Sequence, residues 1–409
     1  MLKGNAVVGQ SGGPTSAINA TLSGVIRGCA KANEEGVIKT LYGMRNGIEG
    51  FLEERLVDLG SHFPDEEWLA TLETTPAAAL GSCRRKLKSH DVDAATYERM
   101  FEIFKKYDIR YFFYIGGNDS MDTVLKLSEY AKEHKYELRV VGIPKTIDND
   151  LMATDHTPGF GSAAKFVATT VKEILRDVSV YTVKAVTIVE VMGRDAGWLT
   201  ASAALPEISG DGPDLIYLPE RVFDTEEFIA SVKSAMEKHP AVLVCASEGI
   251  RFADGEYVGS GGQSGAVDAF GHKYLSGTGK VLENIVKEKL GCKVRSIELS
   301  LPQRCAAHIG SLTDINESVG VGMAGVRLAL LGNTGVMATI ERSAEKEYSV
   351  SYGMADIRTI ANEIKTVPMD YINEAGNGVT EKCLEYLRPL IVGETAVKYE
   401  NGLPKHVII

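Results

Sequence analysis

The sequence contains no long apolar run, no closely paired cysteines and no excess of basic residues. No hydrophobic stretch approaches the roughly 20 residues that a membrane-spanning helix needs. The apolar run after Gly4 is soon interrupted by polar residues and is too short for a signal peptide. The six cysteines occur without a Cys-x-x-Cys pair, which argues against a zinc ribbon and a disulfide framework. We therefore expect a cytoplasmic protein with reduced thiols and no membrane partner.

The net charge argues against nucleic-acid binding. The chain has 44 Lys and Arg against 55 Asp and Glu, a formal charge of -11 that repels nucleic-acid backbones and anionic membranes. The densest basic cluster, Arg84-Arg85-Lys86 with Lys88, is short. It fits a clamp for a phosphate or pyrophosphate group, and it fits a solvated surface cluster equally well.

Strand-like and helix-like segments alternate along most of the chain, with no internal repeat and no low-complexity segment. This alternation predicts parallel sheets covered by helices on both faces, and a hydrophobic content of 44% over 409 residues is enough for two domains. The expected fold class is α/β, with two Rossmann-like three-layer αβα domains.

The expected strands are 5–9, 111–115, 138–143, 185–191, 215–218, 241–246, 294–299 and 336–340. The expected helices are one starting near Ile18 and those at 97–107, 121–134, 160–178, 225–238, 279–290 and 313–331, with weaker candidates at 355–364 and 380–387. We interpret 40–57 as a connection with a partial helix. We interpret 260–265, which is rich in small residues, as a loop, an insertion or a plain connection.

Two glycine-rich turns each follow an expected strand and open an expected helix. The first, 10–16, contains Gly12 and Gly13, whose lack of side chains lets a ligand approach the backbone. The free N–H groups at the following helix start supply donors for a phosphate. A tight structural connection is an equal alternative for this turn.

The second turn has the sequence Gly116-Gly117-Asn118-Asp119-Ser120. Asn118 and Asp119 place oxygen ligands beside a bound phosphate, and Mg²⁺ is commonly held by few protein oxygens together with phosphate and water. The alternative is that these side chains cap the helix N-terminus. We favour the magnesium site because of the paired glycines.

The stretch 142–150 concentrates charge immediately after an apolar strand. Open α/β sheets bind their ligands beyond the carboxyl ends of strands, where this stretch would lie. Asp148 is the candidate general base, Asp150 its electrostatic partner and Lys145 a cation for a phosphoryl group. Thr146 would hydrogen-bond the same ligand. A solvated Asx-rich turn is the alternative.

Further polar residues follow the later strands. The loop Met192-Gly193-Arg194 carries an arginine that can bind a phosphate or carboxylate, and Asp195 is expected to cap the next helix. Glu248 either accepts hydrogen bonds from a sugar hydroxyl or is an edge carboxylate. Arg304, in Leu301-Pro302-Gln303-Arg304, is a second arginine at a strand end.

Together, 116–120, 144–150 and 192–194 resemble the 6-phosphofructokinase family, and the match runs in order from roughly residue 5 to 340. The resemblance implies that Asp148 deprotonates the 1-hydroxyl of fructose 6-phosphate, with Lys145 and Asp119 also catalytic. It implies a donor site formed by Gly12, Gly13, Arg84 and Gly117. It implies a substrate site formed by Thr146, Ile147, Asp148, Asp150, Met192, Gly193, Arg194, Glu248, Leu301, Pro302, Gln303 and Arg304.

Two departures from the ATP-using pattern of that family bear on the phosphoryl donor. ATP-using members carry Gly-Gly-Asp-Gly-Ser and a glycine before Thr-Ile-Asp-Asn-Asp, whereas this chain has Asp119 and Lys145 at those places. Both replacements resemble the pyrophosphate-using branch. The Asp119 side chain would obstruct and repel the α-phosphate of a nucleotide, and the Lys145 ammonium would neutralise charge on a small inorganic donor. We therefore expect reversible phosphoryl transfer from pyrophosphate to fructose 6-phosphate, giving fructose 1,6-bisphosphate and orthophosphate.

Other departures concern the metal and the sugar phosphate. Asn118 stands where the ATP-type pattern has an aspartate, so the metal ligand is Asn118, Asp119 or a water held by either. The run 301–304 lacks the histidine of the ATP-type pattern. Lys184 falls one position from an arginine that, in that pattern, reaches a neighbouring subunit.

The resemblance places the active site in a cleft between two domains. It implies a donor- and Mg²⁺-binding domain of residues 1–153 and roughly 300–340, and a fructose 6-phosphate-binding domain of 154–299 and the C-terminal part of 341–409. It implies a homodimer, with a homotetramer as the alternative. The rival functions are an ATP-dependent 6-phosphofructokinase and a non-catalytic regulatory subunit that binds a sugar phosphate. A dinucleotide-dependent oxidoreductase is disfavoured because the full dinucleotide fingerprint is missing.

Overall fold

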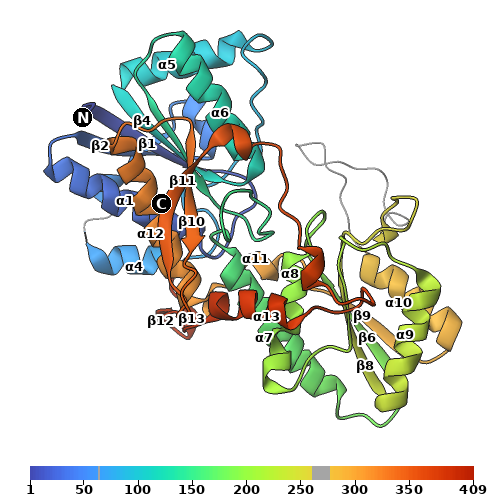
Figure 1. Cartoon of the computed structure of the whole chain (residues 1–409). Helices are drawn as coiled ribbons and strands as arrows, with labels where there is room; N and C mark the ends of the chain where they lie inside the picture. The colour runs from blue at the N-terminus through green and yellow to red at the C-terminus, as the bar shows by residue number, and fades with distance from the viewer. Residues whose placement is uncertain (63–64, 260–276) are drawn as a thin grey trace.

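The structure, a computed structural model, describes residues 1–62, 65–259 and 277–409. It has two lobes, each built on its own sheet and covered by helices (Figure 1). The expected α/β class with mainly parallel sheets is confirmed. Within the described ranges, none of the helices combines the length and the apolar character needed to cross a membrane.

The first sheet has seven strands in the order β11-β10-β5-β4-β1-β2-β3. These strands are β1 Gly4–Gln10, β2 Ile38–Met44, β3 Leu56–Asp58, β4 Ile109–Gly116, β5 Arg139–Pro144, β10 Val336–Arg342 and β11 Val350–Asp356. The five inner strands are parallel, while β3 and β11 run antiparallel at the two edges. The carboxyl ends of β1, β4 and β5 therefore meet at one edge of the sheet.

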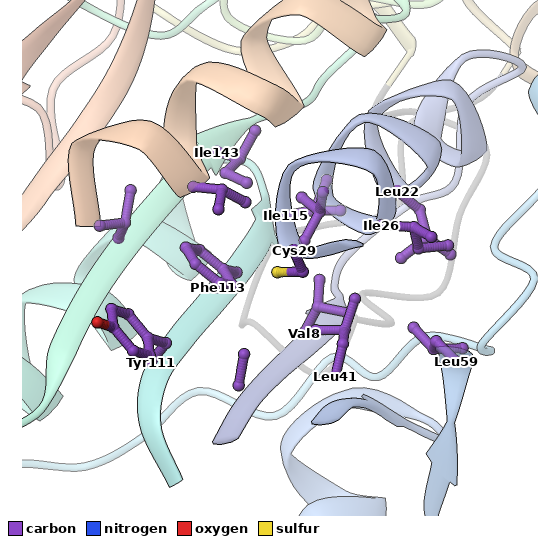
Figure 2. Packing of buried hydrophobic residues seen from close by; sticks show 14 of the residues in the cluster. Val8, Leu22, Ile26, Cys29, Leu41, Leu59, Tyr111, Phe113, Ile115 and Ile143 are labelled. Atoms are coloured by element: carbon purple, nitrogen blue, oxygen red, sulfur yellow. The ribbon is translucent and has the colours of Figure 1, made fainter. Parts of the chain in front are cut away.

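Helices cover both faces of this sheet because its strands are apolar on both sides. Residues Tyr111, Phe113 and Ile115 of β4 face α1 Ile18–Glu34 and α12 Leu312–Leu330 (Figure 2). The intervening Phe112 and Tyr114 face α5 Ala94–Lys106 and α6 Asn118–Glu133. The short helices α2 Gly47–Leu52, α3 Leu59–His62 and α4 Glu66–Glu73 complete this lobe.

Helices α1 and α12 cross so closely that glycine is needed at the contact. A Cβ atom on Gly24 would lie 2.1 Å from the carbonyl oxygen of Val319, and one on Gly322 would lie 2.3 Å from that of Thr21. Real Cβ atoms do not approach backbone oxygens this closely. The crossing therefore brings α12, from late in the chain, directly onto the first helix.

The second sheet has four parallel strands in the order β7-β8-β6-β9. They are β6 Ala185–Val191, β7 Leu215–Tyr217, β8 Ala241–Ser247 and β9 Lys293–Glu298. One face packs against α7 Phe160–Val178 and the C-terminal α13 Glu381–Leu387, the other against α9 Thr225–Lys238 and α10 Thr278–Leu290. Further short elements are α8 Trp198–Ala201, the 3-10 helix Ser202–Ser209, α11 Pro302–Cys305 and the small hairpin β12 Tyr399–Glu400 with β13 Leu403–Pro404.

Most expected elements are present, and those at 160–178, 185–191 and 225–238 have the expected bounds. The prediction of a helix at 355–364 is wrong. The first of these residues end strand β11, which pairs with β10 through contacts such as Met337 with Ala355, and a 3-10 turn at Ile357–Thr359 follows. Interpreting 40–57 as a connection missed β2 and β3, although its partial helix is α2. The stretch 260–265 lies outside the described residues.

Candidate active site

Loops from both sheets line one cavity of about 430 Å³. Three of them follow β1, β4 and β5 of the first sheet, and two follow β6 and β8 of the second. The cavity is lined by Gly12, Gly13, Pro14, Thr15, Arg84, Lys86, Gly117, Asn118, Asp119, Ser120, Lys145, Thr146, Ile147, Asp148, Asp150, Met192, Arg194, Asp195, Ala196, Glu248, Arg304, Asn362 and Ile364. Its volume is toward the small end of the range of about 300–1,000 Å³ that is usual for ligand pockets.

Lys145 lies at the centre of the first-sheet side of the cavity. Its side chain is buried, and its ammonium donates to the carbonyl oxygen of Gly13 at 2.6 Å. Burial lowers the pKa of Lys145 to about 8, although the nearby Asp148 and Asp150 carboxylates oppose this. The ammonium therefore lies between the first glycine turn and the carboxylates, where it can pair with an anion.

Asp148 and Asp150 carry strongly perturbed carboxyl groups. Burial raises the pKa of Asp148, against the attraction of Lys145 and Arg194. Burial and then the charge of Asp148 raise the pKa of Asp150 to about 7. Thr146 holds the loop, since the backbone N–H of Asp148 donates to its hydroxyl at 3.0 Å. A carboxylate with a raised pKa is a stronger base, which suits the removal of a proton from an alcohol.

The second glycine turn does not form the helix cap that was the alternative to a magnesium site. The N-cap of α6 is Gly117, and no side chain there makes a capping hydrogen bond. The Asn118 side chain is engaged elsewhere: its Oδ1 accepts from Asn362 N at 2.6 Å and its Nδ2 donates to Glu363 O at 2.6 Å. The Asp119 carboxylate is 3.1 Å from the ammonium of Lys86. The turn therefore presents one carboxylate to the cavity, while the amide of Asn118 binds the C-terminal part of the chain.

Two arginines converge on the first glycine turn. A Cβ atom on Gly13 would lie 3.0 Å from Nη1 of Arg304 and 3.9 Å from Nη2 of Arg84. Burial and the adjacent Arg84 charge lower the pKa of Arg304. Such a pair of guanidinium groups attracts a polyanion. Arg304, which the resemblance assigns to substrate binding, lines the cavity beside Arg84 and Gly13.

The second-sheet side of the cavity is built around Glu248. Its Oε1 accepts from Gly193 N at 3.3 Å, and burial raises its pKa to about 7. Gly193 has a φ of +135°, a conformation that favours glycine. Buried Gln303 accepts from Met192 N at 3.1 Å. Gln303 therefore supports the 192–194 loop from behind.

The structure brings most of the predicted site residues together but leaves four outside the cavity wall, namely Gly193, Leu301, Pro302 and Gln303. The Leu301 side chain is exposed on the surface of the protein. Asp195, expected as a helix cap, instead pairs with Arg251 at 2.5 Å, and Gly197 is the N-cap of α8.

Eight residues of the cavity wall were not among the predicted site residues. Five of them belong to loops whose other residues were predicted, namely Pro14, Thr15, Ser120, Asp195 and Ala196, and the other three are Lys86, Asn362 and Ile364. Lys86 belongs to the basic cluster that fits a phosphate clamp, but its ion pair with Asp119 was not predicted. Asn362 and Ile364 stand in a segment that carries no motif, so no signal in the sequence marks them.

Comparisons with known proteins identify the family of the chain. Residues 5–327 match the family model described as Phosphofructokinase. The "Pyrophosphate--fructose 6-phosphate 1-phosphotransferase" of Halomonas elongata is 42% identical over 99% of this chain and 96% of its own length. The protein of the same name from Xanthomonas campestris pv. campestris is 45% identical over 100% of this chain and 96% of its own.

A solved structure agrees as well. The pyrophosphate-dependent phosphofructokinase of Nitrosospira multiformis superposes with a TM-score of 0.88 at 40% identity, covering 98% of this chain and 95% of that one. Family model, full-length relatives and fold therefore coincide. This chain belongs to the phosphofructokinase family.

Proposed function

We propose that the protein transfers a phosphoryl group reversibly from pyrophosphate to the 1-hydroxyl of fructose 6-phosphate. The products are fructose 1,6-bisphosphate and orthophosphate, and the step serves both glycolysis and gluconeogenesis. Relatives with 42–45% identity over the full length carry the name of this activity. The observation that carries the proposal is that Asp148 and Lys145 open into the same cavity, with Asp119 on its wall.

In the proposed reaction, Asp148 takes the proton of the sugar hydroxyl as its oxygen attacks the phosphorus in line. The bond from that oxygen to phosphorus forms while the bridging bond of pyrophosphate breaks, and orthophosphate leaves. Lys145 neutralises charge on the transferring group, together with backbone N–H groups of the glycine turns. Arg84 holds the donor phosphates, and Arg304 beside it binds the sugar substrate. The Asp148 proton is returned to bulk solvent or, in the reverse direction, to the sugar oxygen.

The second-sheet loops would hold the sugar. Arg194 supplies a cation and Glu248 an acceptor for sugar hydroxyls, while Met192 contributes apolar contact. Together with Thr146 and Asp150 they orient the 1-hydroxyl toward Asp148. These assignments rest on the shared cavity and on the family resemblance.

Enzymes of this family generally need a divalent metal ion, and we propose Mg²⁺ here. The residues fit this ion, since Asp119 offers a carboxylate oxygen and phosphate and water supply the remaining ligands. Asp119 is a better candidate than Asn118, whose side chain is bonded to residues 362 and 363. Among the described residues there is no cluster of three or more His, Cys, Asp or Glu side chains that could hold a metal alone. When bound, the ion supplies charge neutralisation on the phosphoryl oxygens.

The donor assay tests the proposal directly. Purified protein with fructose 6-phosphate is given pyrophosphate or ATP, and fructose 1,6-bisphosphate is measured. We expect turnover with pyrophosphate and little with ATP. Turnover with ATP alone would establish the rival ATP-dependent enzyme, whereas sugar-phosphate binding without transfer from either donor would establish a regulatory subunit.

We further infer a cytoplasmic homodimer, with a homotetramer as the alternative. The proposed donor domain comprises 1–153 and roughly 300–340, and the proposed sugar domain comprises 154–299 and the C-terminal part of 341–409. In support, β10 joins the first sheet and α13 packs on the second. Strand β11, at 350–356, also joins the first sheet, so part of the C-terminal region belongs with the donor side.

A further inference from the structure

Residues 362–367 lie beyond the part of the chain that the family model matches, and they run along the cavity wall. Asn362 and Ile364 face the cavity. The backbone of 362 and 363 is held by the Asn118 side chain through two hydrogen bonds of 2.6 Å. This segment is therefore bonded to the start of α6, where the donor is proposed to bind.

Lys365 joins the same segment to the catalytic loop, defined here as residues 145–155. Its backbone N–H donates to the carbonyl oxygen of Asp150 at 2.8 Å. Its ammonium donates to the carbonyl oxygens of Asp155 at 2.8 Å and Thr154 at 3.1 Å. The Lys365 side chain thus binds two backbone carbonyl oxygens at the end of the catalytic loop.

The catalytic loop needs support from outside. Asn149 has a φ of +54° and Ala153 a φ of +61°, a region that residues with a side chain rarely adopt. The Asn149 side chain accepts from Thr157 N at 3.1 Å and from the Lys365 ammonium at 3.4 Å. These bonds oppose relaxation of the loop that carries Asp148.

The far side of the segment is tied to the second lobe. The indole N–H of Trp198 donates to the carbonyl oxygen of Lys365 at 2.9 Å. Glu220 Oε1 accepts from Val367 N at 2.9 Å and from Gly197 N at 2.8 Å. The segment therefore couples the catalytic loop to the start of α8, which follows the predicted sugar-binding loop at 192–194.

Charge explains why a lysine stands at this place. Burial lowers the pKa of Lys365 to about 8, with Asp155 and Asp150 opposing and Arg342 adding to the effect. In return, the Lys365 charge is among the influences that counteract the raised pKa of Asp150. A buried cation is weak evidence for a stabilising role, because its desolvation can exceed the attraction that it gains. Its hydrogen bond to the backbone of Asp150 and its effect on the Asp150 carboxyl give it a role in the chemistry instead.

We propose that Lys365 is a positioning residue for phosphoryl transfer, which holds the catalytic loop in its strained shape and keeps a positive charge behind Asp150. The turnover part of this proposal rests on the proposed function. The loop-holding part does not, because it follows from the hydrogen bonds of Lys365 alone.

The test compares Lys365→Met with the matched control Lys382→Met, whose ammonium pairs with exposed Asp370 on the surface. For Lys365→Met we expect kcat to fall by on the order of 100-fold, since displacement of a reacting group by about 1 Å has that effect. The KM for fructose 6-phosphate should change little. The acid limb of the kcat profile should move to higher pH, because Asp150, which interacts with Asp148, loses the nearby Lys365 cation that lowers its pKa. Lys365→Arg should recover part of kcat and restore the acid limb, and Lys382→Met should match the wild type.

Hydrogen exchange gives a readout that needs no turnover. In Lys365→Met, amides of residues 148–155 should exchange faster than in the wild type, while those of β8 should not change. A wild-type kcat and pH profile in Lys365→Met, or unchanged exchange in the loop, would overturn the proposal. If wild type turns over with ATP rather than pyrophosphate, the donor proposal fails and Lys365 is tested with ATP. If Lys365→Met does not fold, Lys365→Gln, which keeps a donor but no charge, is measured and should show the same shift of the acid limb.

Discussion

At the scale of single residues, burial acts in opposite directions on the two charges beside the reacting group. It raises the pKa of Asp148 and lowers that of Lys145 to about 8, because a low-dielectric site disfavours either charged form. The pKa values of both groups are thereby brought closer to neutral pH, where proton transfer costs little free energy. The chemistry predicted from the motif Lys145 to Asp150 thus depends on an enclosure that the motif does not itself contain.

The first prediction concerns Asp148. Asp148→Asn should lower kcat by about 10²–10⁴-fold, the usual contribution of general base catalysis, while binding of fructose 6-phosphate is retained. In the wild type, kcat should fall as pH drops through the raised pKa of Asp148, because the protonated carboxyl is no base. Steady-state kinetics and calorimetric titration measure both. Asp211→Asn, at a surface ion pair with Arg176, is the control; turnover near the wild-type level in Asp148→Asn would refute the assignment.

The second prediction concerns donor choice. Asp119→Gly with Lys145→Gly should open space and remove charge beside the two glycine turns, and so admit ATP. We expect the ratio of kcat/KM for ATP to that for pyrophosphate to rise by at least about tenfold, equivalent to roughly 1.4 kcal/mol. Each single variant serves as a control for the other. An unaltered ratio in the double variant would show that selectivity lies elsewhere in the cavity.

At the scale of elements, the close packing of α12 on α1 positions residues 312–342, which form α12 and β10, against the first sheet. Helix α12 continues into β10, which pairs with β5, the strand that leads into the catalytic loop. The glycines at this crossing therefore support the site from a distance.

The third prediction follows from that packing. Gly24→Ala should reduce the free energy of unfolding by about 1–3 kcal/mol, because the methyl group meets the Val319 carbonyl and must push the helices apart. Urea unfolding measures the change. Gly60→Ala is the matched control, since among the described residues a Cβ atom there would meet the Asp58 carboxylate, at 3.4 Å. Equal stability of the two variants would mean that the helices separate without cost.

At the scale of the whole molecule, several ionisable groups are buried in or beside the cavity between the two sheets, where their charged forms are unfavourable. Asp148, Asp150, Lys145, Glu248 and Lys365 all have pKa values displaced by burial. An arrangement chosen for stability alone would leave such groups in water. Bound anions and sugar hydroxyls would relieve part of this cost in the working enzyme.

The fourth prediction is a pH dependence of stability. With a pKa of about 7 in the folded state against an ordinary 3.8, Asp150 holds a proton that the unfolded chain has released between roughly pH 4 and 7. The free energy of unfolding should therefore fall as pH rises through this window. Asp150→Asn lacks this dependence, so its stability relative to the wild type should rise by about 1–2 kcal/mol between pH 5 and pH 8. Urea titrations of the ligand-free protein measure it, with exposed Asp254→Asn as control; a constant difference across pH would contradict it.

The sequence by itself determined the α/β class, most helices and strands, and the loops that carry the chemistry. It could do so because hydrophobic period, glycine turns and motif residues are local features of the chain. The helix expected at 355–364 failed for the same reason: β11 exists through its pairing with β10, and strand formation depends on such partners more than on the segment itself.

Only the tertiary structure decided how distant residues meet at the site. It placed Arg304 beside Arg84 and Gly13, engaged Asn118 with the backbone of residue 363, which lies 245 positions later, and set Lys365 under the catalytic loop. It also produced the burial that shifts the pKa values of Asp148 and Lys145. These features arise from contacts between segments far apart in the chain, whose positions follow from the packing of both sheets and leave no local pattern to read.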